Sequence, residues 1–328
     1  MALKVGKKVF GTLCGIGAAV CYGTNPLGAL NLYADGMATN CVLFYRFCLA
    51  FLIMAVVMLF RKESLRVSWQ EFKVVSALGI LFIFSSLSLY LSFLYMPAGI
   101  ASTILFTYPI MTVLIMLLVY HEHATLLTWL CIALATAGVV MLYWTGEGGS
   151  ALSPGGVILV LISALTYAVY IVVVGKAKME CSSFKINFYV LLWCALGMLL
   201  YTWLGNALMP ADMRAGHNGS AALVGPLMLP HSLRGWFFVT WLAVVPGIGA
   251  LVMMVYSSKY TGATTTSILG ALEPLTAVII GIFVFNEPFT PRLAAGIILI
   301  ISAVTMIAYA QSPHSKKQHT RPEKLGCS

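Results

Sequence analysis

The stretch Gly262–Pro288, which reads GATTTSILGALEPLTAVIIGIFVFNEP, is apolar and long enough to cross a membrane, yet it carries one acid and one proline near its middle. Pro274 has no backbone N–H, so a helix through it leaves the carbonyl of Gly270 without a partner. A carboxylate at the centre of a bilayer costs about 3 kcal/mol or more, so Glu273 should face a partner or a water-filled cavity. We predict a membrane-spanning helix over about 262–285 with Glu273 near its middle.

The same stretch occurs a second time, earlier in the chain. Residues Tyr95–His123, YMPAGIASTILFTYPIMTVLIMLLVYHEH, align without a gap on Tyr260–Pro288. The matched pairs include Tyr95 with Tyr260, Ala98 with Ala263, Ser102 with Ser267, Pro109 with Pro274, Val113 with Val278 and Glu122 with Glu287. Tyr108 occupies the position that Glu273 holds in the later copy, so the acid near the middle belongs to one copy alone.

The composition is that of a membrane protein. Of the 328 residues, 60% are hydrophobic and 9% are charged, whereas about 25% are charged in a soluble domain. No Asp, Glu, Lys or Arg occurs between Val74 and His121, a length that fits two helices joined at Met96–Gly99. The net charge of +9 lies in loops and tails, so it does not indicate nucleic-acid binding. The eight cysteines form no CxxC pair and are expected to be free thiols.

Apolar runs separated by Gly, Pro, Asn or charged residues predict an all-α integral membrane protein of ten spans. These spans cover about 9–31, 40–60, 73–95, 98–120, 124–145, 154–175, 184–208, 235–257, 262–285 and 290–311. We predict a first five-helix repeat over 1–145, a second over 154–311 and a disordered basic cytoplasmic tail over 312–328. The N-terminal apolar run follows three lysines but lacks a small-x-small cleavage site, so it is expected to remain as the first helix.

The basic residues predict the orientation. With the N-terminus in the cytoplasm, 15 Lys and Arg residues fall on the cytoplasmic side and 3 on the other, and Arg46 lies within a span. This bias predicts that both termini are cytoplasmic. Because each half has an odd number of spans, the halves are inverted copies, and Gly11–Tyr22 aligns without a gap on Gly156–Tyr167 in support. Inverted repeats are typical of secondary transporters that bind the solute near the membrane midplane.

These features resemble a known family, the EamA-type members of the drug/metabolite transporter superfamily. The resemblance rests on Tyr45-Arg46-Phe47, on the two repeated stretches that end at Glu122 and Glu287, and on the Gly-rich tenth span. It implies a multi-pass protein of the bacterial inner membrane that imports or exports small metabolites, often amino acids or drugs. It also implies that spans 1–4 and 6–9 surround a central cavity while spans 5 and 10 are peripheral. The second half has no arginine that matches Arg46.

Two charged residues within spans are the first candidates for the site. Glu273 either faces the cavity, where it binds an ammonium group or a proton, or serves as a structural acid that bonds freed backbone or an arginine. A helix over 262–285 would place it on a face of small residues with Thr266, Gly270, Ala277 and Gly281. Arg46 either clamps a carboxylate or phosphate, reaches out to the interface, or pairs with Glu273 in one transport state.

Further candidates come from helix breaks and aromatic side chains. In Tyr22-Gly23-Thr24-Asn25-Pro26, Pro26 frees the carbonyl of Tyr22, and such breaks either line transport sites or serve packing. The helix-break and gating candidates are Pro26, Pro109, Pro274 and Gly270. The substrate-binding and coupling candidates are Glu273, Arg46, Asn25, Tyr22, Tyr90, Tyr108, Tyr167 and Trp193. Tyr95, Tyr170 and Tyr256 could also line the cavity.

Glu122 and Glu287 are expected to be structural rather than functional. Thr125 and Thr290 follow them at matched positions, so each acid is predicted to cap the start of the next helix. His121 and His123 flank Glu122, but adjacent residues of one helix point apart, so no metal site is expected.

Together these observations predict a secondary transporter rather than an enzyme, with a small solute and possible proton coupling by alternating access. A sensor or assembly subunit that transports nothing is the alternative, and an intramembrane enzyme is disfavoured because all six histidines lie in loops or at span ends. No GxxxxGK[ST] motif for ATP binding occurs, and no cofactor is expected. The solute, the direction of transport and the choice between monomer and homodimer stay open.

Overall fold

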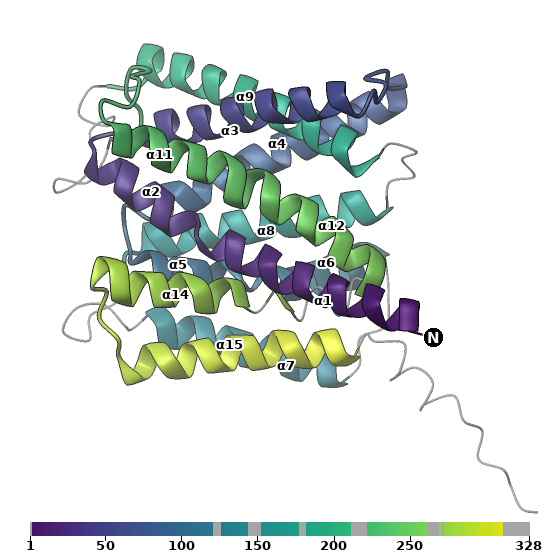
Figure 1. The fold of residues 1–328 in the computed structure, drawn as a ribbon. Coiled ribbons are helices and arrows are strands. Elements are labelled where there is room, and N and C mark those ends of the chain that lie inside the picture. The colour runs from purple at the N-terminus through teal and green to yellow at the C-terminus, as the bar shows by residue number, and fades with distance from the viewer. Residues whose placement is uncertain are drawn as a thin grey trace, which may run out of the picture.

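A computed structural model describes residues 2–120, 126–143, 152–176, 182–210, 222–261, 269–270 and 272–310, and helices dominate these residues (Figure 1). The helices are α1 (Ala2–Gly23), α2 (Asn25–Ala34), α3 (Thr39–Phe60), α4 (Trp69–Ser92), α5 (Ala98–Leu105), α6 (Tyr108–Tyr120), α7 (Leu126–Tyr143), α8 (Pro154–Lys176), α9 (Ser183–Leu208), α11 (Leu233–Leu242), the π-helix η3 (Ala243–Gly249), α12 (Ala250–Thr261), α14 (Leu272–Phe285) and α15 (Pro291–Ala310). No strand occurs among the described residues.

Several helical stretches are long and apolar enough to span a bilayer. Within the described residues there are seven, namely Val9–Ala34, Thr39–Phe60, Trp69–Ser92, Ala98–Val119, Pro154–Val173, Phe184–Leu208 and Leu233–Met254. Leu272–Phe285 and Pro291–Ala303 are shorter apolar helices. Large apolar side chains such as Phe283, 80% exposed, lie on the outside, as lipid contact requires. The all-α membrane class is therefore confirmed, and the number of ten spans stays a prediction.

Three of the predicted spans are interrupted, and each interruption precedes a proline. The span 9–31 is divided between α1 and α2, and the span 98–120 is divided between α5 and α6. The third is the span 262–285, in which a turn at Gly270 precedes α14. Pro26, Pro109 and Pro274 all lie in the first turn of the helix that follows, where a proline's missing N–H has no helical partner to lose. The prediction of one helix with Glu273 near its middle is wrong, because α14 begins at Leu272 and Gly270 lies in a turn.

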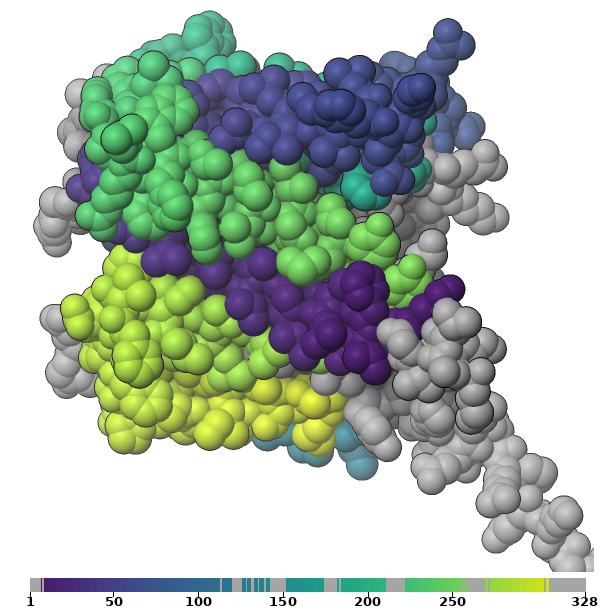
Figure 2. Space-filling view, viewed as in Figure 1, coloured from purple at the N-terminus to yellow at the C-terminus, as the bar shows by residue number. Residues whose placement is uncertain are grey.

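The helices of the two halves pack against each other rather than forming two separate bundles. The most extensive contacts of α3, α5 and α7 with the second half are with α9, α14 and α15 respectively. The contact between α4 and α8 has a counterpart in the contact between α12 and α1, which hold the corresponding places in the two halves. Figure 1 shows α7 with α15 at one edge and α3 with α9 at the opposite edge. On the face in Figure 2, α11–α12, α1–α2 and α14 form adjacent bands.

Glu287 does not cap the helix that follows it, contrary to the sequence-based expectation. Thr290 caps α15 instead, since its Oγ1 accepts a hydrogen bond of 3.1 Å from the backbone N–H of Leu293. The Glu287 carboxylate accepts backbone N–H bonds from Ala98 at 2.7 Å and Gly99 at 3.1 Å, at the start of α5 in the first half. Burial raises the pKa of Glu287, and these two bonds act in the opposite direction. Glu122, Thr125, His121 and His123 lie outside the described residues.

Candidate functional site

A cavity lies between the two halves of the chain, and helices of both halves line it: α1, α2, α3, α4, α5 and α6 of the first and α8, α9, η3, α12 and α14 of the second. It consists of three adjoining recesses, and Tyr22 lines all of them. The largest of the three is lined by Tyr22, Asn25, Arg46, Phe82, Ser85, Ser86, Leu89, Tyr90, Leu105, Tyr167 and Glu273. The peripheral helices α7 and α15 contribute none of the described residues that line these recesses.

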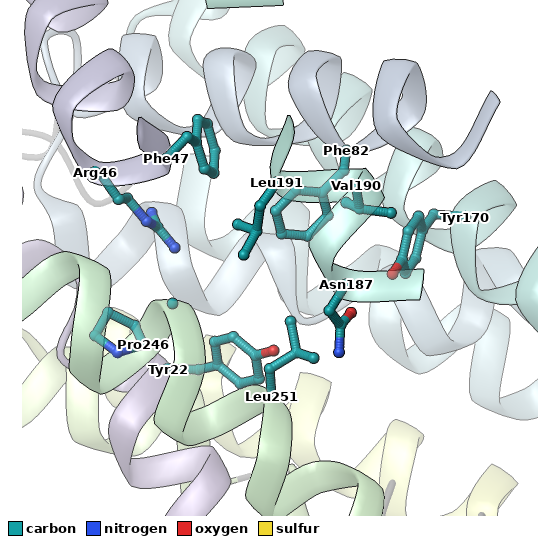
Figure 3. Close-up of a pocket in the computed structure, with 11 residues that line it drawn as sticks. Tyr22, Arg46, Phe47, Phe82, Tyr170, Asn187, Val190, Leu191, Pro246 and Leu251 are labelled. Carbon is teal, nitrogen blue, oxygen red and sulfur yellow. The ribbon is translucent and has the colours of Figure 1, made fainter. Parts of the chain in front are cut away.

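Arg46 enters the cavity from α3 and is held there by Tyr90. Its side chain is only 4% exposed, and its Nη1 donates a hydrogen bond of 2.5 Å to the Tyr90 hydroxyl. Among the described residues its buried Nε has no hydrogen-bond partner. Figure 3 shows Arg46 and Tyr22 reaching into the same space from different helices. A buried guanidinium with an unused donor is well suited to bind an anionic group.

The break between α1 and α2 positions the groups that hold Tyr90. Asn25 Nδ2 donates to the carbonyl of Tyr22 at 2.8 Å, which satisfies the acceptor that Pro26 frees. The other atom of the amide, Oδ1, accepts a bond of 3.2 Å from the Tyr90 hydroxyl. Arg46, Tyr90 and Asn25 therefore form one chain of hydrogen bonds from α3 through α4 to the start of α2.

Glu273 faces the cavity from the first turn of α14. Its backbone N–H donates a hydrogen bond of 2.9 Å to the carbonyl of Gly270. This bond satisfies the carbonyl that Pro274, which has no N–H, leaves without a helical partner. The side chain is partly exposed and lines two of the recesses with Tyr22 and Tyr167. Within the described part of the chain, its carboxylate forms no hydrogen bond and no ion pair, and the one ion pair found joins Arg61 to Glu63. Glu273 and Arg46 are thus unpaired in this conformation.

Close packing of α1 on α14 sets the position of Glu273. Gly23 ends α1 opposite the first turn of α14, and a Cβ added to it would lie 2.7 Å from the carbonyl oxygen of Glu273 and 2.5 Å from the Thr276 side chain. Only glycine permits this approach, so the helix break in the first half and the acid in the second lie side by side.

Aromatic rings line the cavity that Arg46 and Glu273 also line. The rings of Tyr108 and Tyr167 meet edge to face at 4.8 Å between centroids, and Tyr170 stacks on Tyr167 at 5.9 Å. Phe82 packs against Tyr170 at 5.5 Å. Such rings offer apolar contact and cation–π attraction to a solute.

Most of the predicted site residues come together, and some do not. The residues that line the recesses include Tyr22, Asn25, Arg46, Tyr90, Tyr108, Tyr167, Gly270 and Glu273, as well as Tyr170. Trp193 lies apart, beside Gly79 and Phe72. Tyr95 is exposed, and Tyr256 packs on Phe10 and Tyr260. Pro26, Pro109 and Pro274 start helices but are not among the lining residues.

Several lining residues were not predicted from the sequence. They include Phe82, Ser85, Ser86, Asn187 and Pro246. Asn187 and Pro246 carried a signal, since both are unusual inside predicted spans. Pro246 lies in the π-helix η3, where the Ala250 N–H bonds to the Val245 carbonyl across the wider turn.

The arrangement offers groups that suit charges of both signs. Arg46 suits a carboxylate or phosphate, Glu273 suits a protonated amine, and Ser85, Ser86 and Asn187 add neutral hydrogen-bonding groups. No cluster of three or more His, Cys, Asp or Glu residues that could hold a metal occurs among the described residues.

Comparisons with known proteins agree with this architecture. The sequence model of the EamA-like transporter family matches residues 9–144 and 154–309. An uncharacterized transporter of Archaeoglobus fulgidus is 28% identical over 156 residues, 48% of each chain. An uncharacterized transporter of Synechocystis is 26% identical over 253 residues, which are 73% of this chain and 68% of that one. The uncharacterized transporter YdfC of Bacillus subtilis is 21% identical over 254 residues, 77% of this chain and 75% of its own length.

A solved crystal structure shares the fold. It aligns with a TM-score of 0.61 and 18% identity, and the alignment covers 90% of this chain and 96% of the other. The matched segment of the archaeal relative spans about half of that protein's length.

Proposed function

Because this chain belongs to the EamA-like transporter family, we propose that its central cavity carries a small solute across the membrane by alternating access between two inverted halves. The chain is a membrane transporter, and its relatives bear the name of transporters. The observation that carries the proposal is a cavity between the halves that holds both an arginine without its full set of partners and an unpaired acid.

The solute that suits this cavity is an amino-acid-like zwitterion. Its carboxylate meets Arg46, whose Nε has an unused hydrogen, and its ammonium group meets Glu273. Because both residues line the largest recess, one small molecule can contact both. The rings of Tyr22, Tyr167 and Phe82 line the same recess and favour an aromatic or large apolar side chain on the solute.

Glu273 is the proposed site of proton coupling. A carboxylate without a fixed partner in an apolar surrounding can exchange a proton as its access to water changes between transport states. The energy source is then a proton gradient or the gradient of the solute itself.

The proposed topology has ten spans, cytoplasmic termini and a location in the inner or plasma membrane. Support comes from the excess of Lys and Arg, 15 against 3, on one side. The division into a first repeat over 1–145 and a second over 154–311 is supported by the two stretches that match the family model. Packing of α3 on α9, α5 on α14 and α7 on α15 is the pattern that a two-fold axis between the halves produces.

A thermal-shift screen of the purified protein tests the function. The screen compares the amino acids, nucleobases and cationic drugs, and a ligand present at 100 times its Kd stabilises the protein by about 2.7 kcal/mol. We expect zwitterionic amino acids to raise the unfolding temperature and nucleobases to leave it unchanged. Uptake of the best ligand by proteoliposomes then follows; stabilisation without any uptake would favour the sensor alternative.

A further inference from the structure

The end of α14 is bonded to the start of α5 by a single side chain. Glu287 Oε1 accepts the N–H of Ala98 at 2.7 Å, and its Oε2 accepts the N–H of Gly99 at 3.1 Å. These donors belong to the first turn of α5, whose preceding residue, Pro97, provides no side-chain cap. A carboxylate at a helix N-terminus gains from both the free N–H groups and the helix dipole. Glu287 thus caps the start of a helix that lies 189 residues earlier in the sequence.

The slot that holds the carboxylate is built from glycines. A Cβ on Gly99 would lie 2.9 Å from Glu287 Oε2, and a Cβ on Gly281 would overlap the same atom. The chain turns into the slot at Asn286, whose φ of 53° is a left-handed conformation that asparagine tolerates. The Glu287 N–H then bonds to the Gly281 carbonyl at 2.9 Å. Gly99 of α5, Gly281 of α14 and the turn at Asn286 after α14 therefore together accommodate the Glu287 carboxylate.

The contact joins the two halves of the chain. Helix α5 belongs to the first half and α14 to the second, and they also meet where Gly99 approaches Val278, with 3.1 Å between the added Cβ and the Val278 Cα. The same two helices supply Leu105 and Glu273 to the largest recess. In the proposed topology, Glu287 and the start of α5 lie at the outer face.

We propose that Glu287 is a positioning residue that latches α5 to α14 and holds the outer end of the cavity closed. This inference rests on the alternating access proposed above, since outward opening separates these helices and moves the carboxylate away from the two N–H groups. The latch differs from its counterpart in the repeat. Gly99 lies in the first copy and Gly281 in the second, and their matched positions hold Thr264 and Met116, so the glycine slot has no counterpart in the repeat.

The distance between the two helices tests the latch without any solute. Spin labels are attached to Tyr95→Cys and Phe289→Cys, exposed positions just before α5 and just after Glu287, in a background without the eight native cysteines. Pulsed electron paramagnetic resonance then measures the label-to-label distances. The parent should give a dominant short-distance population and a minor long-distance one. Glu287→Ala should enlarge the long-distance population about tenfold, the effect of losing one strong charge-assisted cap.

Two further variants complete the test. Glu287→Gln keeps one oxygen to accept an N–H and should give an intermediate increase, which decides the matter if Glu287→Ala does not fold. Glu122→Gln removes the same charge at the matched position of the first copy and should leave the distances as in the parent. Unchanged distances in both Glu287 variants, or an equal increase in Glu122→Gln, would overturn the latch. Because no solute is added, the distances test the latch even if the thermal-shift screen and the uptake assay find no transported solute.

Discussion

Arg46 and Glu273 give one cavity a positive and a negative group that are not neutralised by each other. Both were predicted from sequence because a charged residue inside an apolar span is rare and costly. Their neighbours were harder to predict. Tyr90 was a candidate in its own right, but its hydrogen bond to Arg46, 44 residues away, was not predicted, and Ser85 and Ser86 have no sequence signal apart from being polar. Only the tertiary packing of α3 against α4 and α2 brings these groups together.

The first prediction concerns the titration of Glu273. Glu273→Gln keeps the shape of the side chain but cannot exchange a proton, so we expect solute-dependent proton entry to fall about tenfold or more, equivalent to at least 1.4 kcal/mol of lost interaction. A pH-sensitive dye inside proteoliposomes measures proton entry after addition of the best ligand of the screen. Full proton-coupled uptake by this variant would rule out Glu273 as the coupling site.

Glu63→Gln is the control for that experiment. Glu63 lies in the loop after α3, where it pairs with the half-exposed Arg61 at 3.8 Å. Such surface pairs contribute about 0–1 kcal/mol, so proton entry and unfolding temperature should both stay at parent values.

At the scale of the helices, the breaks decide where the cavity forms. The prolines in the sequence predicted breaks, since each frees a carbonyl of the preceding turn. In the structure these breaks are turns that end one helix and begin the next just before Pro26, Pro109 and Pro274, and they are not kinks within long helices. The π-helix around Pro246 was not predicted, because a proline inside an apolar run is equally compatible with a kink or a widened turn.

The second prediction tests the contact between α1 and α14. Gly23→Ala would place a methyl group 2.5 Å from Thr276 and 2.7 Å from the Glu273 carbonyl, which forces the helices apart. We expect a loss of about 1–3 kcal/mol of stability, seen as a lower unfolding temperature in detergent. Gly155→Ala in α8 is the matched control, since its nearest neighbour is 3.8 Å away. Its unfolding temperature should be equal or slightly higher. Equal behaviour of the two variants would show that α1 and α14 can separate without cost.

At the scale of the whole molecule, two copies of one helical pattern enclose the cavity. The repeat was readable from the gapless alignment of Tyr95–His123 on Tyr260–Pro288, and the helices α5 and α14 that arise from it pack on each other. The bond from Glu287 to α5 was not predictable in the same way. Sequence rules assign a cap to the nearest helix start, and here the nearer start is capped by Thr290.

The third prediction concerns orientation. In a background without native cysteines, a membrane-impermeant maleimide added to intact cells should label Tyr95→Cys in the outer loop and should label Lys176→Cys at the end of α8 only after the membrane is permeabilised. Labelling of Lys176→Cys in intact cells would reverse the proposed topology.

The most direct test of the central claim is the stabilisation of the purified protein by three related probes. L-phenylalanine carries both charges, phenethylamine only the positive one and 3-phenylpropanoate only the negative one. The proposed cavity predicts that L-phenylalanine raises the unfolding temperature most, that Glu273→Gln abolishes the effect of phenethylamine, and that Arg46→Gln abolishes the effect of 3-phenylpropanoate. Equal shifts in the parent and both variants, or no shift with L-phenylalanine, would contradict a cavity that binds a zwitterion between Arg46 and Glu273.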